Sequence, residues 1–456
     1  MKKTPVLLFV ALCVVLNTHA QTLWKKVLPF PLTWGIYTMF EDTTDHSAYM
    51  AGAFTTVNGT PCNMIKWDGG SNFIMLPPSP LYNTFCITKY KGKIYAGGYG
   101  LACWDGNSWT TLDNGSGGNT LVNCFYHYQG KLLVGGFYGS IAGSGYGSLA
   151  AWNDTSWSSV YGADTLLGFS QVAAIADYKG KLYIGGNFNG LPSDTTINDI
   201  AMFDGQKWSN VGGQMPFTSL AFVSKLIVWN DTLYVGGDFN ESWGCPGNGI
   251  ASWDGQNWHR LGKAAMGLPE VAITDFLIKD NTLYGVGAFK SIDGINLDFY
   301  GPGVKNIVKW DGFKWCTLNT VTDLGISYLA TFNDTLYGLG NFSVVNGDSI
   351  PWVAKWIGGN YSDSCSLGKA GITGSELSAN SFEVYPNPAQ GFIYVKTTLR
   401  STDMIFSLCD ITGKILLQQS ITDNARIDIN ALSPGIYLYR VTTDGILQKT
   451  GKVLRQ

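Results

Sequence analysis

The chain has 456 residues and a formal net charge of −3 at pH 7, from 30 basic and 33 acidic side chains. This balance disfavours a surface that binds nucleic-acid phosphates, because such a surface needs an excess of lysine and arginine. Charged residues make up only 14% of the chain, against roughly 25% in an average protein. Glycine is abundant and aromatic residues reach 14%, which suits strands and tight turns. We therefore expect an all-β protein with almost no helix.

The first 20 residues have the layout of a secretory signal that is cleaved on export. Two lysines precede an apolar run over residues 6–16, and the small residue Ala20 ends the segment. The mature chain is then expected to begin at Gln21, with 28 basic and 33 acidic residues and a net charge of −5. No later segment is apolar over the length that a membrane-spanning helix needs, so we expect no transmembrane segment in the mature chain.

One pattern recurs seven times after this signal. Its first half is an apolar strand that ends near a glycine pair, as in Leu182–Phe188, and its second half is an aromatic residue followed by Asp-Gly, as in Trp253-Asp254-Gly255. The first halves lie at residues 48–54, 94–99, 132–137, 182–188, 233–239, 283–289 and 336–342. Copies of about 50 residues have the length of a propeller blade.

Two hairpin signals in each copy predict four short antiparallel strands. In one copy, Tyr178-Lys179-Gly180 separates the first two strands and an Asp-Gly turn separates the last two. The strands of this copy are expected at residues 172–178, 181–188, 200–203 and 207–211. We therefore predict a seven-bladed β-propeller over residues 21–365. Trp24–Val27 has the pattern of a fourth strand but precedes the first copy, so we expect it to pair with the last blade and close the ring.

The glycine pair followed by a spaced tryptophan resembles the repeats of kelch-type propellers. A closer resemblance is to the Gly-Gly-Asn-Phe and Trp-Asp-Gly repeats of bacterial surface proteins and of the fungal cortical polarity-marker family. The resemblance implies a propeller fold. It implies no particular activity, because such scaffolds carry unrelated functions.

The loops between the second and third strands of the blades are expected to lie together on one face of the ring. They are long and variable, at residues 138–147, 189–199, 240–249, 290–306 and 343–352, and function usually resides on such loops. Trp243, Trp352 and Trp34 lie near this face and outside the recurring aromatic positions. We predict that they bind a sugar or peptide by stacking. The alternative is that they pack the loops onto the ring.

Catalysis is the second functional hypothesis. A hydrolase or lyase acting on polysaccharide would use two carboxylates of the same face, and the candidates are Asp194, Asp199, Glu241, Asp293, Asp298 and Asp348. The simpler interpretation is that these are solvated loop residues. The three mature histidines fall in different blades, and the metal motif of galactose oxidase is not visible, so we expect no metal and no other cofactor. A non-enzymatic protein that binds a glycan or a protein is therefore the favoured hypothesis.

Two patterns in the sequence suggest covalent modification, by a disulfide and by O-glycosylation. Cys86 and Cys124 occupy the same place in adjacent copies and are predicted either to form a disulfide between blades or to be two buried free thiols. Asp-Thr or Asp-Ser followed by an aliphatic residue or threonine resembles the O-glycosylation sequon of exported Bacteroidetes proteins, although turn chemistry explains it equally well. This pattern begins at Asp42, Asp164, Asp194, Asp231, Asp334 and Asp348.

The C-terminal region follows a polar linker at residues 366–380. Alternating apolar residues predict a small antiparallel β-sandwich over residues 381–456. Three ordered motifs in it resemble the type A sorting domain of the type IX secretion system: Tyr385, Pro386, Asn387 and Pro388; Asp410, Gly413 and Lys414; Gly435 and Tyr437. The resemblance implies export by the type IX secretion machinery, to the medium or the outer cell surface, typically with cleavage of this tail.

Overall fold

The computed structural model describes residues 23–456 apart from 114–119, 163–169, 192–193, 213–220, 262–264, 267–271, 289–290, 293–294, 297–306, 311–314, 360, 362–381, 398–403, 411–414 and 444–445. The predicted signal and linker lie outside the described residues. Within the described ranges the regular structure consists of β-strands and one short 3-10 turn, η2 (Glu241–Trp243). The expectation of an all-β protein is confirmed.

Most strands between residues 24 and 356 form four-stranded antiparallel sheets, which we number 1 to 7 in chain order. Sheets 5 and 6 are joined by a single residue pair, Asp238 opposite Ala272. From first to fourth strand, sheet 1 contains β2 (Ile36–Asp42), β3 (Ser47–Gly52), β6 (Met64–Trp67) and β7 (Phe73–Met75), and sheet 2 contains β8 (Thr84–Tyr90), β9 (Lys93–Gly98), β10 (Gly100–Trp104) and β11 (Trp109–Thr111). Sheet 3 contains β12 (Leu121–Tyr128), β13 (Lys131–Phe137), β14 (Leu149–Trp152) and β15 (Trp157–Ser158). Sheet 4 contains β16 (Gln171–Tyr178), β17 (Lys181–Leu191), β18 (Asp194–Phe203) and β19 (Trp208–Asn210). Sheet 5 contains β20 (Phe222–Trp229), β21 (Thr232–Asp238), β22 (Ile250–Trp253) and β23 (Trp258–Arg260). Sheet 6 contains β25 (Ala272–Lys279), β26 (Thr282–Ala288), β29 (Ile307–Trp310) and β30 (Trp315–Thr317). Sheet 7 contains β31 (Tyr328–Phe332), β32 (Thr335–Leu339), β35 (Val353–Trp356) and β1 (Trp24–Lys26).

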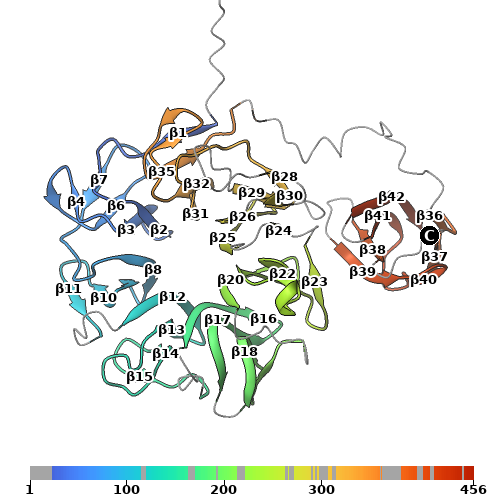
Figure 1. The fold of residues 1–456 in the computed structure, drawn as a ribbon, viewed down its shortest axis with the longest axis horizontal. Helices are drawn as coiled ribbons and strands as arrows, with labels where there is room; N and C mark the ends of the chain where they lie inside the picture. The colour runs from blue at the N-terminus through green and yellow to red at the C-terminus, as the bar shows by residue number, and fades with distance from the viewer. Residues whose placement is uncertain are drawn as a thin grey trace, which may run out of the picture.

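The last of these sheets is completed by the first strand of the chain. β1 pairs antiparallel with β35, with Trp24 opposite Trp356, which confirms the predicted pairing of the N-terminal segment with the last repeat. The first strands of the sheets contact one another in cyclic order, and β31 of sheet 7 contacts β2 of sheet 1. Figure 1 shows the sheets following one another around a common centre, an arrangement that we call the ring.

The glycine pairs allow neighbouring sheets to approach closely. A Cβ atom at Gly185 would collide with Val223 of the next sheet, and one at Gly186 would collide with the backbone of Gln171 in the first strand. Glycine has no such atom, so it fits where two backbones or a backbone and a side chain meet. This explains why the pair recurs on the second strand.

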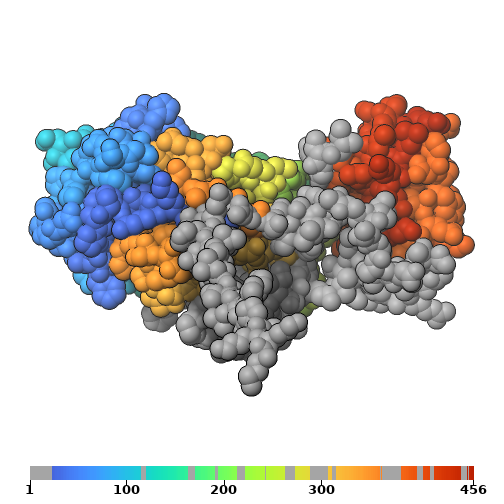
Figure 2. Space-filling model, turned by 90° about the horizontal axis from the view of Figure 1, so that it is seen from above, coloured from blue at the N-terminus to red at the C-terminus, as the bar shows by residue number. Residues whose placement is uncertain are grey.

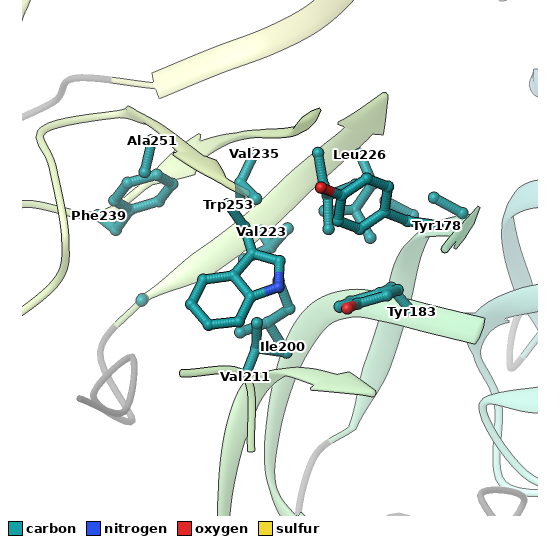
Figure 3. Close-up of a cluster of buried hydrophobic side chains, with 14 of the residues drawn as sticks. Tyr178, Tyr183, Ile200, Val211, Val223, Leu226, Val235, Phe239, Ala251 and Trp253 are labelled. Carbon is teal, nitrogen blue, oxygen red and sulfur yellow. The ribbon is translucent and has the colours of Figure 1, made fainter. Parts of the chain in front are cut away.

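The recurring aromatic residues join each sheet to the one before it. Figure 3 shows Trp253 of sheet 5 beside Tyr178 and Tyr183 of sheet 4, all buried in one apolar cluster. The indole N–H of Trp258 donates a hydrogen bond to the carbonyl oxygen of Val211, at 3.1 Å. Buried aromatic rings provide large apolar area at these junctions, so these repeat tryptophans are structural, as predicted.

The C-terminal strands form two sheets that share one apolar core. One sheet contains β36 (Phe382–Tyr385), β37 (Phe392–Thr397) and β40 (Ala425–Asp428), and the other contains β39 (Ile415–Ile421), β38 (Met404–Cys409), β41 (Gly435–Thr443) and β42 (Ile446–Arg455). Ile393 of the first sheet and Phe406 of the second are both fully buried in this core. Figure 2 shows these strands, in orange and red, as a compact body of their own.

Candidate functional site

The connections between second and third strands carry additional small elements on one face of the ring, which we call the long-loop face. The opposite face carries the turns between first and second strands, and we call it the short-turn face. The additional elements are the hairpins β4 (Thr56–Val57) with β5 (Thr60–Pro61), β33 (Val344–Val345) with β34 (Asp348–Ser349), and β27 (Ser291–Ile292) with β28 (Ile295–Asn296), which is joined by β24 (Ala265–Met266). In sheet 4 the predicted strands 181–188 and 200–203 extend instead into the longer hairpin of β17 and β18.

Asn-Gly turns close two of these hairpins. Asn58 and Gly59 both have positive φ, at 49° and 77°, and so do Asn346 and Gly347, at 52° and 88°. Such a pair is the strongest short sequence signal for a two-residue hairpin. The signal was present in the sequence, and our sequence analysis missed it.

Sheet 2 differs from its neighbours because it has no loop at this place. Gly98 at the end of β9 pairs with Gly100 at the start of β10, and only Tyr99 lies between them. The loops of the long-loop face are therefore interrupted over sheet 2.

The three predicted ligand-binding tryptophans lie in two places. Trp34 precedes β2 and is 61% exposed, whereas Trp352 is half-buried against the core shared by sheets 7 and 1. They flank one junction, because Gly35 donates to the side chain of Asn341 at 3.0 Å and Gly340 donates to the carbonyl oxygen of Trp352 at 3.2 Å.

Trp243 lies elsewhere, in η2 of sheet 5. Its ring is half-buried and packs against the core of sheets 4 and 5. The structure therefore brings Trp34 and Trp352 to one junction and leaves Trp243 on another sheet.

A row of aromatic rings crosses sheets 7, 1 and 2 at the starts of their first strands. Tyr328 lies 6.0 Å from Tyr37, Tyr37 stacks at 6.0 Å on Phe85, and Phe85 meets Tyr99 edge to face at 5.7 Å, as centroid distances. We call these four residues the aromatic row. Tyr37 and Phe85 are the extra residues of equivalent bulges in β2 and β8, which sequence analysis did not detect because a bulge shows only in the strand register.

Exposed aromatic side chains lie in this row and near it. Tyr82 is 73% exposed just before β8, Tyr99 is 45% exposed, and Phe137 at the end of β13 is 40% exposed. The starts of first strands and the ends of second strands lie on the long-loop face. Together with Trp34, these rings therefore give the long-loop face of sheets 1 to 3 an aromatic surface.

The described carboxylates of the catalytic hypothesis have separate surroundings. Asp194 accepts hydrogen bonds from the hydroxyl and amide of Thr196, which lower its pKa. Glu241 forms an ion pair with Arg260, and Asp348 lies exposed in β34. Asp293 and Asp298 lie outside the described residues.

Asp199 is not a solvated loop residue. Its side chain is fully buried, and burial raises its pKa to about 8 although the amide of Phe188 donates to Oδ1 at 3.1 Å. Its Oδ2 has no hydrogen-bond partner. The expectation of a solvated carboxylate is therefore wrong for Asp199, because the β17–β18 hairpin folds over it.

The histidines are bound to separate protein groups. His127 lies 3.0 Å from the hydroxyl of Thr88, and burial lowers its pKa. His259 pairs with Asp254 at 2.7 Å. In the part of the chain that the structure describes, no three His, Cys, Asp or Glu side chains cluster as metal ligands would.

The cysteines follow the second of the two alternatives that the sequence left open. Cys86 and Cys124 are free thiols, and burial raises the pKa of both, to about 12 for Cys124. A disulfide occurs instead at Cys316, and its partner lies outside the described residues. The free cysteines among the described residues are Cys62, Cys86, Cys103, Cys124, Cys245 and Cys409.

A polar pocket of about 490 Å³ opens on the short-turn face between sheets 1 and 2. Its Asp42 is nearly buried, which would raise the pKa of this carboxyl, but hydrogen bonds from Lys89 and Thr44 outweigh burial and lower it. Lys89 lies 2.7 Å from Asp42. Glu41 and Lys91 also line the pocket, so its two carboxylates and two ammonium groups balance.

The motifs of the C-terminal region come together around its last strand. The side chain of Asn387 donates to the carbonyl oxygen of Lys452 at 2.6 Å and accepts from the amide of Leu454 at 2.9 Å. Tyr437 donates its hydroxyl proton to Ser433 at 2.6 Å. Gly413 and Lys414 lie outside the described residues.

Residues 383–456 match the sequence family described as the secretion system C-terminal sorting domain. The chain ends in a sorting domain. Because this sorting domain is handled by the type IX secretion system, the protein is secreted or held at the cell surface. Among the described residues, no helix has the length and apolar character needed to cross a membrane.

Two solved structures from Bacteroides thetaiotaomicron are weakly similar in fold. The extracellular domain of a putative hybrid two-component system aligns with a TM-score of 0.48 and 11% identity, over 93% of this chain and 57% of that one. A quinoprotein alcohol dehydrogenase-like protein aligns with a TM-score of 0.35 and 12% identity, over 90% and 84%. The chain thus spans little more than half of the first domain, and likenesses this weak support no inference about activity. No curated protein matches the sequence.

Proposed function

We propose that residues 21–365 form a seven-bladed β-propeller with kelch-like repeats, made with a signal peptide at residues 1–20 and joined through a linker at 366–380 to a C-terminal domain at 381–456. The type IX secretion machinery delivers it to the outside of the cell. There the propeller binds a glycan or a protein through its long-loop face, without chemical change to the ligand.

The cyclic contacts of the first strands support the propeller. β1 supports closure of the ring, since it pairs with β35 and leaves no gap between the first and last sheets. The single observation that carries the binding function is the aromatic surface of the long-loop face. Exposed aromatic rings gathered on one side of a secreted protein are typical of a ligand site.

A hydrolase or lyase has less support. That activity needs two carboxyl groups facing each other across a sugar, whereas Asp194, Asp199 and Glu241 are each engaged or buried separately. Product analysis of every bound polysaccharide separates the two functions, because a binding protein leaves its ligand intact.

The test uses residues 21–456 against polysaccharides and surface proteins, with three tryptophan variants. We expect Trp34→Ala to weaken binding without changing Tm, because this ring is exposed. Trp243→Ala and Trp352→Ala remove half-buried rings, and a loss of about 2 kcal/mol should lower Tm by roughly 3 °C. Release of a product would show that the protein is a hydrolase or lyase and would overturn the proposal. Unchanged binding in all three variants would show that these tryptophans do not belong to the binding site.

A further inference from the structure

Five of the segments that build the long-loop ends of sheets 1 to 3 contain no charged residue. They are residues 27–40, 48–65, 74–88, 94–104 and 132–153, and we call their long-loop ends the uncharged sector. Charges begin where the strands reach the short-turn face, as at Asp42, Lys66 and Lys89. One carboxylate, Asp113, follows β11 between sheets 2 and 3, and it is 3% exposed.

The remainder of the same face carries charged residues. Over sheets 4 to 7 the described part of it has Asp194, Asp323 and Asp348, and Glu241 in an ion pair with Arg260. A protein with an excess of acidic residues therefore has one sector of its long-loop face with no exposed charge in the described residues. That sector complements a ligand without charge.

The exposed apolar side chains of this sector on the long-loop face are aromatic. Tyr82, Tyr99, Trp34 and Phe137 are 40–73% exposed, whereas the exposed aliphatic residues of sheet 1 belong to its outer strand, β7. Tyrosine and tryptophan present a flat apolar face together with a polar atom. The C–H face and hydroxyl groups of a sugar ring match this combination.

Uncharged hydrogen-bonding groups lie beside these rings. Asn83 Oδ1 and Asn123 Nδ2 are buried without a hydrogen-bond partner. Asn123 is the extra residue of the bulge in β12, the position that Tyr37 and Phe85 occupy in sheets 1 and 2. Both atoms are shielded from solvent, so these amides add uncharged polar groups beneath the surface of the sector and do not contact a ligand directly.

We propose that the uncharged sector binds a neutral polysaccharide chain, which stacks on Tyr82 and Tyr99 where the loops are interrupted over sheet 2. The proposal rests on the proposed binding function and narrows it to one ligand class. Since only Tyr99 joins β9 to β10, the sector is open there to a chain longer than one or two sugars. An acidic polysaccharide would find no exposed lysine or arginine in the sector. Protein interfaces are also rich in aromatic residues, so binding of a protein instead of a polysaccharide is an outcome that the experiment distinguishes.

The experiment measures binding of residues 21–456 to soluble neutral polysaccharides (a β-glucan, a mannan and a xylan) and to charged ones (polygalacturonate and chitosan) by affinity electrophoresis and calorimetry. We expect a neutral polysaccharide to bind with an affinity that does not change between low and high salt. Tyr82→Ala and Tyr99→Ala should each weaken it by about tenfold. Leu324→Ala is the matched control, because Leu324 is 67% exposed outside the sector, and it should leave binding unchanged. All variants should keep the wild-type Tm.

Three outcomes would overturn the inference, and a fourth would overturn the proposed function. Binding of the charged polysaccharides alone, or affinity that falls steeply with salt, would exclude a neutral ligand. If a neutral polysaccharide still binds after both tyrosine substitutions but not after Trp243→Ala, the site lies on sheet 5, and the proposed binding function is retained. Binding to none of the polysaccharides would reject this ligand class and favour a protein partner. Cleavage of a bound polysaccharide would instead reject the proposed non-enzymatic function.

Discussion

Asp199 lies at the base of the β17–β18 hairpin with its carboxyl group fully buried and φ at 56°. Burial raises its pKa to about 8, well above the usual value of an aspartate, so between these two pH values the folded chain holds a proton that the unfolded chain releases. The contribution of this carboxyl to the free energy of unfolding is therefore fully present below pH about 4 and is lost as pH rises toward 8. The carboxyl works against the fold at neutral pH.

We expect Asp199→Asn to stabilise the protein at pH 7 by up to about 4 kcal/mol and to remove this pH dependence. The amide keeps an acceptor for Phe188 and cannot ionise. Urea unfolding between pH 5 and 9 measures both effects. Equal slopes of stability against pH in the two proteins would contradict the assignment.

Asp154 occupies the glycine position of the Trp-Asp-Gly turn in sheet 3. Its φ is 85°, a conformation that costs a non-glycine residue energy. Its carboxylate accepts from Lys93 at 2.9 Å and from Tyr95 at 2.7 Å, both in sheet 2, and these bonds lower its pKa. Strain in the turn is thus offset by a link between two sheets.

Two substitutions at Asp154 separate these effects. Asp154→Ala loses the link and keeps the strained φ, whereas Asp154→Gly loses the link and relieves the strain. We expect the alanine variant to be about 1 kcal/mol less stable than the glycine variant. Equal free energies of unfolding would show that the turn is not strained.

At the scale of elements, β1 depends on contacts far away in the chain. Trp24 is 1% exposed, donates its indole N–H to Thr320 at 2.8 Å, and meets Trp356 edge to face at 4.9 Å. Asp275 forms a comparable link in β25, since it pairs with Lys225 of sheet 5 at 2.7 Å and accepts from the amide of Leu329 in sheet 7 at 2.9 Å. The hydrogen bond to Thr320, which follows β30 of sheet 6, and the contacts of Asp275 join neighbouring sheets, whereas Trp356 lies in the same sheet as Trp24.

We expect Trp24→Ala to destabilise the ring by about 3–5 kcal/mol, and Trp24→Phe by about 1–2 kcal/mol because it mainly loses the hydrogen bond. Hydrogen exchange should accelerate first in β35, the partner of β1. Exchange that accelerates equally in all sheets would instead mean that β1 does not act on sheet 7 in particular.

The whole molecule combines the ring with an export signal that is itself folded. Asn387 ties the first motif of the sorting domain to its last strand through Lys452 and Leu454. Recognition of the sorting domain should therefore depend on this side chain although it lies near the start of the domain.

We expect Asn387→Ala to reduce the exported fraction several-fold while the ring keeps its Tm. Cell fractionation measures the chain in the periplasm and outside. Gln419→Ala, at an exposed position in β39, is the control and should be exported normally. Normal export of Asn387→Ala would show that this link is not needed for sorting.

The sequence by itself determined the features that depend on residues close together in the chain. Turn residues and alternating apolar positions predicted the four-stranded sheets, and ordered motifs predicted the sorting domain. The repeat also predicted a long-range pairing, β1 with β35, because a strand pattern without a partner of its own had to complete another sheet.

Only the tertiary structure decided which side chains meet across sheets. Tyr37, Phe85 and Tyr99 form one row because the bulges of adjacent first strands turn them together, and strand register is not written in local composition. Asp199 is buried and Trp243 half-buried because hairpins and loops fold over them. Exposure and pKa depend on such neighbours, which strand register and the packing of adjacent sheets bring together, so the candidate site could be placed on a face from sequence but not assigned to its residues.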